Sequence, residues 1–291
     1  MEGSHLEIDE APERPDAYRV LAIPDLQVPY HAARTLLSVL EYARGQWWDE
    51  VVLMGDFMDF DCISSFNKGK PRTFSDKTLE RDYGVGNEVL DAIQAAVTEQ
   101  NDDCKIVFLE GNHEYRIERL LDEQPQLQGL LEVPTQLRLR DRGVVWVPCY
   151  TEGTLYRIGR AYFHHGLYTN KYHARSMVES FGVNIFYGHV HDVQSHAMQR
   201  WGRHSTVIGQ SLGCLCNYDL DYVKRRPTNW QHAFAEFWFK PNGDFQYTVT
   251  QIFRGQFYAP DGKLYGRGAK AGYAGAPSSG PCGEAKREEA F

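Results

Sequence analysis

Two observations predict an α/β fold for this chain of 291 residues. In the first third, short apolar runs of strand type alternate with segments whose apolar residues recur at helical spacing. This β-α-β-α-β order is typical of a parallel sheet with right-handed crossovers. The second half is richer in extended segments. The length is sufficient for one large α/β domain or two small ones.

The elements of the first third alternate in the order strand, helix, strand, helix, strand. A buried strand is expected at 18–25 and a helix at 33–45, closed by its final glycine. The second strand is expected at 49–56 and ends in Gly-Asp. A long helical region should run from about 75 to 100, before a third strand at 105–112.

The second half contains extended segments separated by turn signals. The tetrapeptide Pro-Asn-Gly-Asp within its last segment predicts a hairpin. The extended segments are 144–150, 154–166, 184–200, 204–213 and 232–253, with one helix expected at 171–182.

Composition at the two ends sets the expected domain boundaries. Residues 1–17 are acidic and contain proline, which predicts a flexible leader without the apolar core of a signal peptide. Residues 268–291 are rich in Gly, Pro, Ala and Ser, which predicts a disordered tail. A single domain is therefore expected at 18–267.

The net charge and the cysteine pattern indicate which classes of partner and which cellular compartment to expect. The net charge of −8 (31 basic against 39 acidic residues) disfavours nucleic acid as a general partner, although it leaves a local basic groove open. No apolar run approaches the roughly 18 residues of a membrane span. The six cysteines are scattered, and Cys214-x-Cys216 is too tight for the usual structural zinc spacing. We expect a cytoplasmic chain with no membrane partner; the sequence leaves the oligomeric state open.

Polar side chains of the kind that bind metals end five successive strands. In an open parallel sheet such ends converge on one crevice. Each residue has an alternative role, because an Asp after a strand is usually a helix cap and Gly-Asn is a common turn. Five such coincidences in order favour a divalent metal site instead. The residues are Asp25, Asp56, Asn112-His113, His164-His165 and His189-x-His191.

The ordered series resembles the calcineurin-like metallophosphoesterase superfamily. Its motifs here are Asp25-x-Gln27, GDFMD (55–59), GNHE (111–114), HHG (164–166) and GHVH (188–191). The resemblance covers about residues 18–250 and is nearest to compact phage and bacterial members. It implies a four-layer αββα sandwich within the α/β class.

The resemblance also implies two divalent metal ions. Asp56 would bridge them, while Asp25, Gln27 and His191 would hold the first ion. Asn112, His189 and one histidine of the 164/165 pair would hold the second. We favour His165, because the family's ligand directly precedes glycine.

Three further residues are assigned to the substrate. His113 resembles the family's histidine that protonates the leaving oxygen. Arg116 is expected to bind the phosphate, with a solvent-facing helix position as its alternative. His164 is expected at the substrate or as a strand residue behind it.

Gln27 departs from the family pattern, which normally has histidine at this position. An amide oxygen is a harder and weaker ligand, so Mn²⁺ is expected ahead of Mg²⁺, Fe or Zn²⁺. The same substitution occurs in superfamily branches that include manganese-dependent ADP-ribose and CDP-alcohol diphosphatases.

The implied activity is phosphoester hydrolysis, with a metal-activated hydroxide attacking phosphorus and His113 assisting the leaving group. Small phosphodiesters or nucleotides are the expected substrates. A DNA nuclease of the same superfamily is the alternative within the class. A catalytically weak binding scaffold is the alternative from a different class. A phage-encoded member would act in the host cytoplasm.

Overall fold

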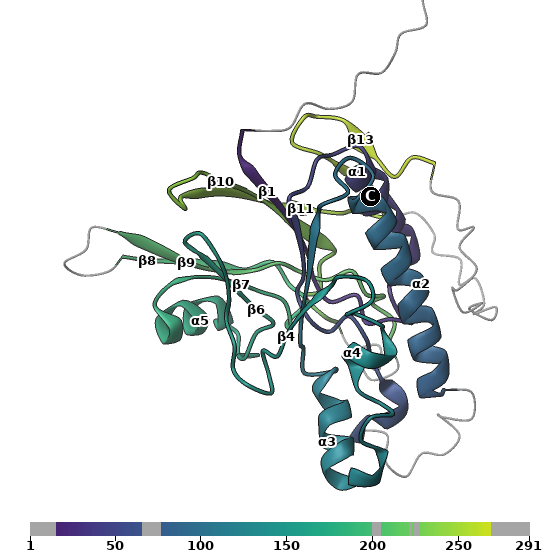
Figure 1. Cartoon of the computed structure of the whole chain (residues 1–291). Helices are drawn as coiled ribbons and strands as arrows, with labels where there is room; N and C mark the ends of the chain where they lie inside the picture. The colour runs from purple at the N-terminus through teal and green to yellow at the C-terminus, as the bar shows by residue number, and fades with distance from the viewer. Residues whose placement is uncertain (1–15, 66–76, 200–204, 221–222, 224–226, 269–291) are drawn as a thin grey trace, which may run out of the picture.

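The computed structural model describes residues 16–65, 77–199, 205–220, 223 and 227–268. Almost all of the predicted leader and tail lies outside these ranges. The described chain forms two sheets, with helices on their outer faces (Figure 1).

The first sheet contains the three strands predicted in the first third of the sequence. They pair in parallel, in the order β1-β2-β3, which confirms the expected parallel core, and β4 adds a fourth parallel strand beside β3. The predicted hairpin adds two antiparallel strands beside β1. The strands are β1 (Tyr18–Ile23), β2 (Glu50–Leu53), β3 (Lys105–Leu109), β4 (Val145–Val147), β10 (Ala233–Phe239) and β11 (Phe245–Gln251).

The second sheet has the order β5-β6-β7-β9-β8. Its three central strands are parallel, and antiparallel strands form both edges. Its strands are β5 (Tyr156–Ile158), β6 (Ala161–His164), β7 (Asn184–Tyr187), β8 (Ser195–Gln199) and β9 (Thr206–Ser211). A separate ribbon of β12 (Phe257–Tyr258) and β13 (Leu264–Tyr265) follows the first sheet in the chain.

The main helices lie where the apolar spacing predicts them. The long helix begins at Leu79 rather than near residue 75, because the Thr78 hydroxyl accepts a hydrogen bond from Arg81 N and caps the first turn. The helices are α1 (Ala33–Arg44), α2 (Leu79–Val97), α3 (Tyr115–Glu123), α4 (Val133–Gln136) and α5 (His173–Phe181), with 3₁₀ turns η1 (Asp61–Ile63) and η4 (Pro125–Leu127).

Alternation along the strands divides the core into layers. Leu21 and Ile23 of β1 face the helices α1 and α2, whereas Val20 and Ala22 face the second sheet. On the far side, α5 packs through Met177 on the outer face of the second sheet. The order helix, sheet, sheet, helix is the four-layer αββα sandwich that the sequence predicts (Figure 1).

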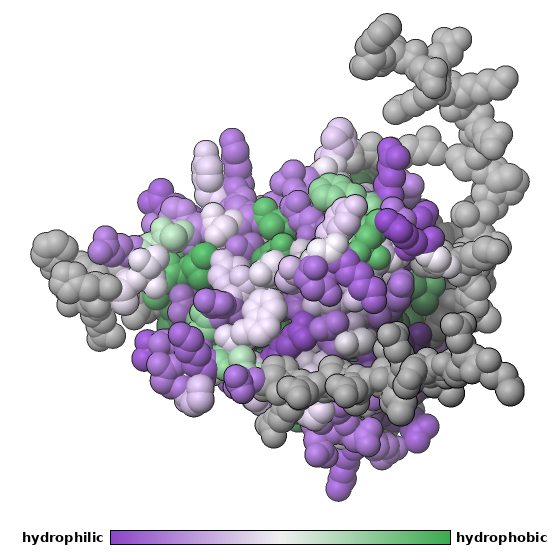
Figure 2. Space-filling view, turned by 90° about the horizontal axis from the view of Figure 1, so that it is seen from above, coloured by the Kyte–Doolittle hydropathy of each residue, from purple (hydrophilic) through white to green (hydrophobic). Residues whose placement is uncertain are grey.

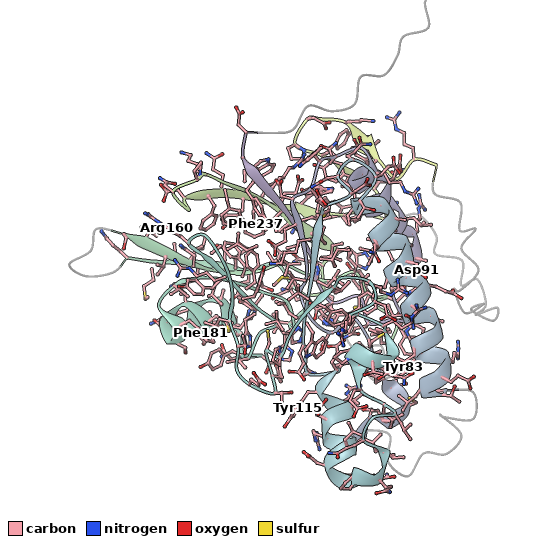
Figure 3. The ribbon with its side chains drawn as sticks, viewed as in Figure 1. Tyr83, Asp91, Tyr115, Arg160, Phe181 and Phe237 are labelled. Carbon is pink, nitrogen blue, oxygen red and sulfur yellow. The ribbon has the colours of Figure 1, made fainter. Side chains whose placement is uncertain are left out.

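Aromatic rings fill the space between the two sheets. Phe237 of β10 is fully buried there, with ring centroids 4.7 Å from Phe186 and 5.1 Å from Phe163 (Figure 3). Phe186 and Phe163 belong to the second sheet, so these contacts join the sheets directly. Edge-to-face ring pairs stabilise such a layer beyond the burial of their surface.

Figure 2 shows the face that lies at the top of Figure 1, and on it hydrophilic and apolar side chains are interspersed. Among the described residues, no helix combines the length and the apolar character needed to cross a bilayer.

Phe237→Ala should destabilise the protein by about 3–5 kcal/mol, because the cavity lies where both sheets meet. Phe253→Ala is the matched control, since this ring is 72% exposed and its loss should change the free energy of unfolding by less than about 0.5 kcal/mol. Urea unfolding of the two variants measures the difference. Equal stability of both variants would contradict the role given to Phe237.

Candidate metal centre

The chain segments that follow β1 and β7 meet at Asp25. The Asp25 carboxylate accepts a hydrogen bond from His189 N, at 2.9 Å to Oδ1 and 3.1 Å to Oδ2. Gly188 permits this approach, since a Cβ there would lie 2.0 Å from Asp25 Oδ2. The contact joins one end of each sheet, so the predicted ligands of β1 and β7 lie together.

The second and third strands are joined by two buried carboxylates. Asp56 Oδ1 accepts a hydrogen bond from His113 N at 2.9 Å. Glu114 Oε2 accepts from Asp56 N and Gly111 N, and its Oε1 accepts from Met58 N, at 2.8–2.9 Å. The turns after β2 and β3 therefore form one hydrogen-bonded unit.

Backbone conformation marks the same residues. Of the eight described non-glycine residues with positive φ, five are predicted metal ligands. Side chains disfavour this region, and such residues cluster at functional sites whose surroundings hold them in place. The five are Asp25 (φ 39°), Gln27 (φ 50°), Asp56 (φ 47°), His189 (φ 71°) and His191 (φ 64°).

The first group of donors comprises Asp25, Asp56 and His191, whose ligand atoms lie within 4.8 Å of one another. His191 Nε2 is 3.3 Å from Asp25 Oδ1. The amide nitrogen of Gln27 is 3.2 Å from the same His191 Nε2. Gln27 thus points into the site, and a half-turn of its amide would place the oxygen there.

The second group comprises Asp56, His165 and His189, again within 4.8 Å. The Nδ1–H of His165 donates to Met54 O at 2.9 Å, which leaves Nε2 3.3 Å from Asp56 Oδ1 and 3.0 Å from Asn112 Oδ1. His189 Nδ1 is buried without a hydrogen-bond partner. Asp56 is the member common to both groups.

The pKa values of the Asp25 and Asp56 carboxyl groups shift in opposite directions. Burial raises the pKa of Asp25. Burial acts in the same direction on Asp56, but His113 and His165 outweigh it and hold the pKa of that carboxyl well below its usual range.

The pKa values of the histidines in the two donor groups also shift in opposite directions. Burial favours neutral imidazole, yet Asp56 raises the pKa of His165 to about 9, and the hydrogen bond that His191 donates to Asp25 raises the pKa of His191 to about 9. Burial lowers the pKa of His189 to about 3. The buried carboxylates thus require positive charge, which divalent cations can supply, and the oxygen and imidazole donors fit such ions.

His113 lies beside the donors. The Nδ1–H of His113 donates to Asp59 O at 2.9 Å, which fixes the tautomer, and its Nε2 is 3.7 Å from Asp56 Oδ2. Arg116 contacts that same Nε2 through Nη2 at 3.0 Å and donates through Nη1 to Asp59 O at 2.7 Å. Two of the three residues predicted to contact substrate, His113 and Arg116, are therefore adjacent.

His164 occupies a different position from His165. It is buried, its Nδ1 accepts a hydrogen bond from Gly166 N at 2.9 Å, and its ring lies between Tyr150 and Phe181. This packing favours the alternative role of a strand residue behind the site.

Two residues near the donors, Glu114 and Tyr150, were not predicted from the sequence to have a role in the site. Glu114 lies three residues after Gly111 and bonds back to its N–H, so the spacing of a capping box was the available signal. The Tyr150 ring lies 5.6 Å from His165 and 6.5 Å from His189, and no local pattern in the sequence indicates this contact.

Comparisons with known proteins identify a family and several relatives. Residues 18–193 match the family model described as calcineurin-like phosphoesterase. The chain is 26% identical over 229 residues to the Gene 54 protein of Mycobacterium phage L5, covering 75% of this chain and 87% of that protein. It is 24% identical over 234 residues to the Gene 54 protein of Mycobacterium phage D29, with the same coverage.

Solved structures with similar folds are more distant. Vacuolar Protein Sorting 29 from Cryptosporidium parvum matches with a TM-score of 0.45 at 14% identity, covering 84% of this chain and 95% of that chain. The nuclease MPE from Pseudomonas putida matches with a TM-score of 0.33 at 12% identity, covering 80% of this chain and 86% of that chain.

Gly111→Ala should weaken Mn²⁺ binding by at least about tenfold, because the new Cβ would lie 2.2 Å from Asp56 N and Asp56 Oδ1 and force the two turns apart. Isothermal titration with Mn²⁺ measures the effect. Gly84→Ala in α2 is the control: its Cβ meets no atom within 4 Å, and alanine should stabilise the helix by up to about 1 kcal/mol. Unchanged Mn²⁺ affinity in Gly111→Ala would refute the proposed crowding.

Proposed function

Because the chain belongs to the calcineurin-like phosphoesterase family, we propose that it is a metal-dependent phosphodiesterase acting on small phosphodiesters or nucleotides. The observation that carries the proposal is the pair of donor groups that share Asp56. His113 lies 3.7 Å from that shared carboxylate, with Arg116 beside it.

Two divalent ions fit the two donor groups. Asp25, Gln27 and His191 would hold the first, and Asn112, His165 and His189 the second, with Asp56 common to both. Bound ions of this kind supply Lewis acidity at phosphorus and lower the pKa of water. We propose Mn²⁺, since three carboxylate or amide side chains, those of Asp25, Gln27 and Asp56, serve the first position.

His113 is the proposed proton donor to the leaving oxygen. Burial lowers its pKa to about 3, and Arg116 acts in the same direction, so the ring is neutral at pH 7 before substrate binds. A phosphate anion placed between His113 and Arg116 brings negative charge to Nε2 and favours the protonated ring. The bond from Nδ1 to Asp59 O keeps Nε2 directed at the reacting group.

Arg116 is the proposed phosphate-binding cation. Among the residues that the structure describes, the carboxylate paired with Arg116 is that of Asp59, with 3.9 Å between Arg116 Nη1 and Asp59 Oδ1. Burial raises the pKa of Asp59 to about 8, so this carboxyl is largely protonated at neutral pH and leaves the positive charge of Arg116 for substrate.

The aromatic side chains beside the donors support a nucleotide as substrate. The rings of Tyr115 and Tyr150 lie 6.4 Å apart, and Tyr150 also contacts His165 and His189. Tyr115 projects from the first turn of α3 (Figure 3). Base stacking on aromatic rings contributes about 1–3 kcal/mol per base. Because the relatives are phage proteins, we propose the host cytoplasm as the site of action.

A chromogenic phosphodiester assay with Mn²⁺, run alongside a labelled DNA duplex and single strand, tests the function. Hydrolysis of the small diester without cleavage of DNA supports the proposal. Preferential DNA cleavage would assign a nuclease instead. Metal binding without turnover of either substrate would assign a binding scaffold.

Asp56→Asn should lower hydrolysis by several orders of magnitude and reduce bound metal, because one charged ligand is lost from both donor groups. His113→Ala should lower turnover while leaving metal content nearly unchanged, because we assign it to the substrate. Metal analysis and turnover of both variants separate the two roles. Near-normal turnover in Asp56→Asn, or metal loss in His113→Ala, would contradict the assignment.

Gln27→His should strengthen the first metal position and shift its preference toward softer ions, because imidazole replaces an amide. The half-saturating Mn²⁺ concentration for activity should fall, and Zn²⁺ should support more activity than in the parent protein. Titrating activity against each ion measures both changes. An unchanged half-saturating concentration would show that the side chain at position 27 does not contact metal.

A further inference from the structure

A third group of donors lies on the other side of the His191 ring. It consists of His191, Cys214 and Cys216, whose ligand atoms lie within 4.8 Å of one another. All three side chains are buried. The two cysteines take no part in the donor groups described above, so their position requires a separate explanation.

The backbone places both sulfur atoms on one side of the chain. Residues 214–216 run extended between two segments: Cys214 N donates to Gln231 O at 3.0 Å, and Leu215 N donates to Asp25 O at 3.0 Å. Leu215 O accepts from Ala32 N at 2.8 Å. In an extended chain, residues two apart face the same side. Cys214 and Cys216 therefore form a pair despite their short spacing.

His191 completes the group through its second ring nitrogen. Its Nε2 faces Asp25 and Gln27, whereas its Nδ1 lies 3.7 Å from Cys216 Sγ. Gln231 fixes this relation, because Gln231 N donates to His191 O at 2.7 Å while Gln231 O accepts from Cys214 N. The ring thus presents one nitrogen to each of two donor groups.

The separation agrees with two ligands on one ion. A tetrahedral zinc about 2.3 Å from sulfur and about 2.0–2.1 Å from nitrogen holds these atoms roughly 3.6 Å apart. A weak N–H···S hydrogen bond has a similar length, so the distance alone does not decide. The side chains of Cys214 and Cys216 also hydrogen-bond to each other, which brings the second sulfur into the group. Two thiolates and an imidazole form a recognised zinc ligand set with an open fourth position.

The surroundings also suit a soft ion. The cysteines pack with Leu220 and Val223, and Trp230 lies over His191 at a ring-centroid distance of 4.3 Å. Thiolate ligands select Zn²⁺ over the hard ions that oxygen donors prefer. The carboxylates and the amide of the neighbouring donor groups have the opposite preference.

We propose that His191 Nδ1, Cys214 and Cys216 form a binding site for one thiophilic divalent ion, Zn²⁺, distinct from the two positions that share Asp56. The proposal goes beyond the phosphodiesterase function. It makes His191 common to a soft-metal site and to the first catalytic position.

Titration of the metal-free, reduced protein with Cd²⁺ tests the site without any measurement of activity. The first equivalent should produce a sulfur-to-cadmium charge-transfer band in the ultraviolet, which carboxylate and imidazole ligands do not give. The Cys214→Ser/Cys216→Ser double variant should lose the band. Cys104→Ser is the control: it replaces another buried cysteine, next to the start of β3, and should keep the band.

Absence of the band in the parent protein, or its persistence in the double variant, would overturn the proposal. A measurement on the parent protein covers the case in which the double variant does not fold. X-ray absorption with one equivalent of Zn²⁺ should show two sulfur ligands and at least one nitrogen ligand. A shell of nitrogen and oxygen alone would overturn the site.

Discussion

One buried carboxylate holds the end of the first sheet together. Glu114 accepts three backbone N–H groups, from Asp56, Met58 and Gly111, which belong to the turns after two neighbouring strands. A carboxylate fully removed from water is costly unless such donors surround it. Burial raises the pKa of Glu114 to about 8, whereas the N–H groups of Met58 and Gly111 act in the opposite direction and favour the charged form. The left-handed conformation of Asp56, and through it the shared position of both donor groups, depends on this small network.

Most of the fold follows from patterns that the sequence displays. Apolar spacing locates the three parallel strands and their helices, and the Pro-Asn-Gly-Asp turn locates the β10–β11 hairpin. The pattern does not reveal that this hairpin leaves the strand-rich half and joins β1 in the first sheet. That choice depends on matching apolar faces across the sandwich, where Phe237 meets rings of the second sheet. Such long-range packing has no local signature.

The sequence likewise predicts one part of the candidate site and not another. The order of polar residues at strand ends predicts which side chains converge, since parallel strands end at one edge. The sequence does not predict how each imidazole is turned. His165 presents Nε2 because Met54 O accepts its other proton, and His191 presents both nitrogens to donors. These orientations arise from backbone carbonyls and from φ values that the residue types alone would disfavour. The spacing of Cys214 and Cys216 alone argues against a zinc site, because the third member of their group, His191, is distant in the sequence.

The pairing of β1 with β10 also has a consequence for synthesis of the chain on the ribosome. Tyr18 pairs with Phe239, and Asp25 O accepts a hydrogen bond from Leu215 N, so the earliest strand has β2 on one edge but lacks its second neighbour, β10, until about four-fifths of the protein has been made. Contacts this far apart in sequence carry a high loop-closure entropy and form late. Until then one edge of β1 is open to pairing with other chains. The last donor of the two groups that share Asp56, His191, is synthesised before β10, after about two-thirds of the chain. A messenger truncated before the β10 region would yield a chain that has these donors but whose first sheet lacks β10 and β11.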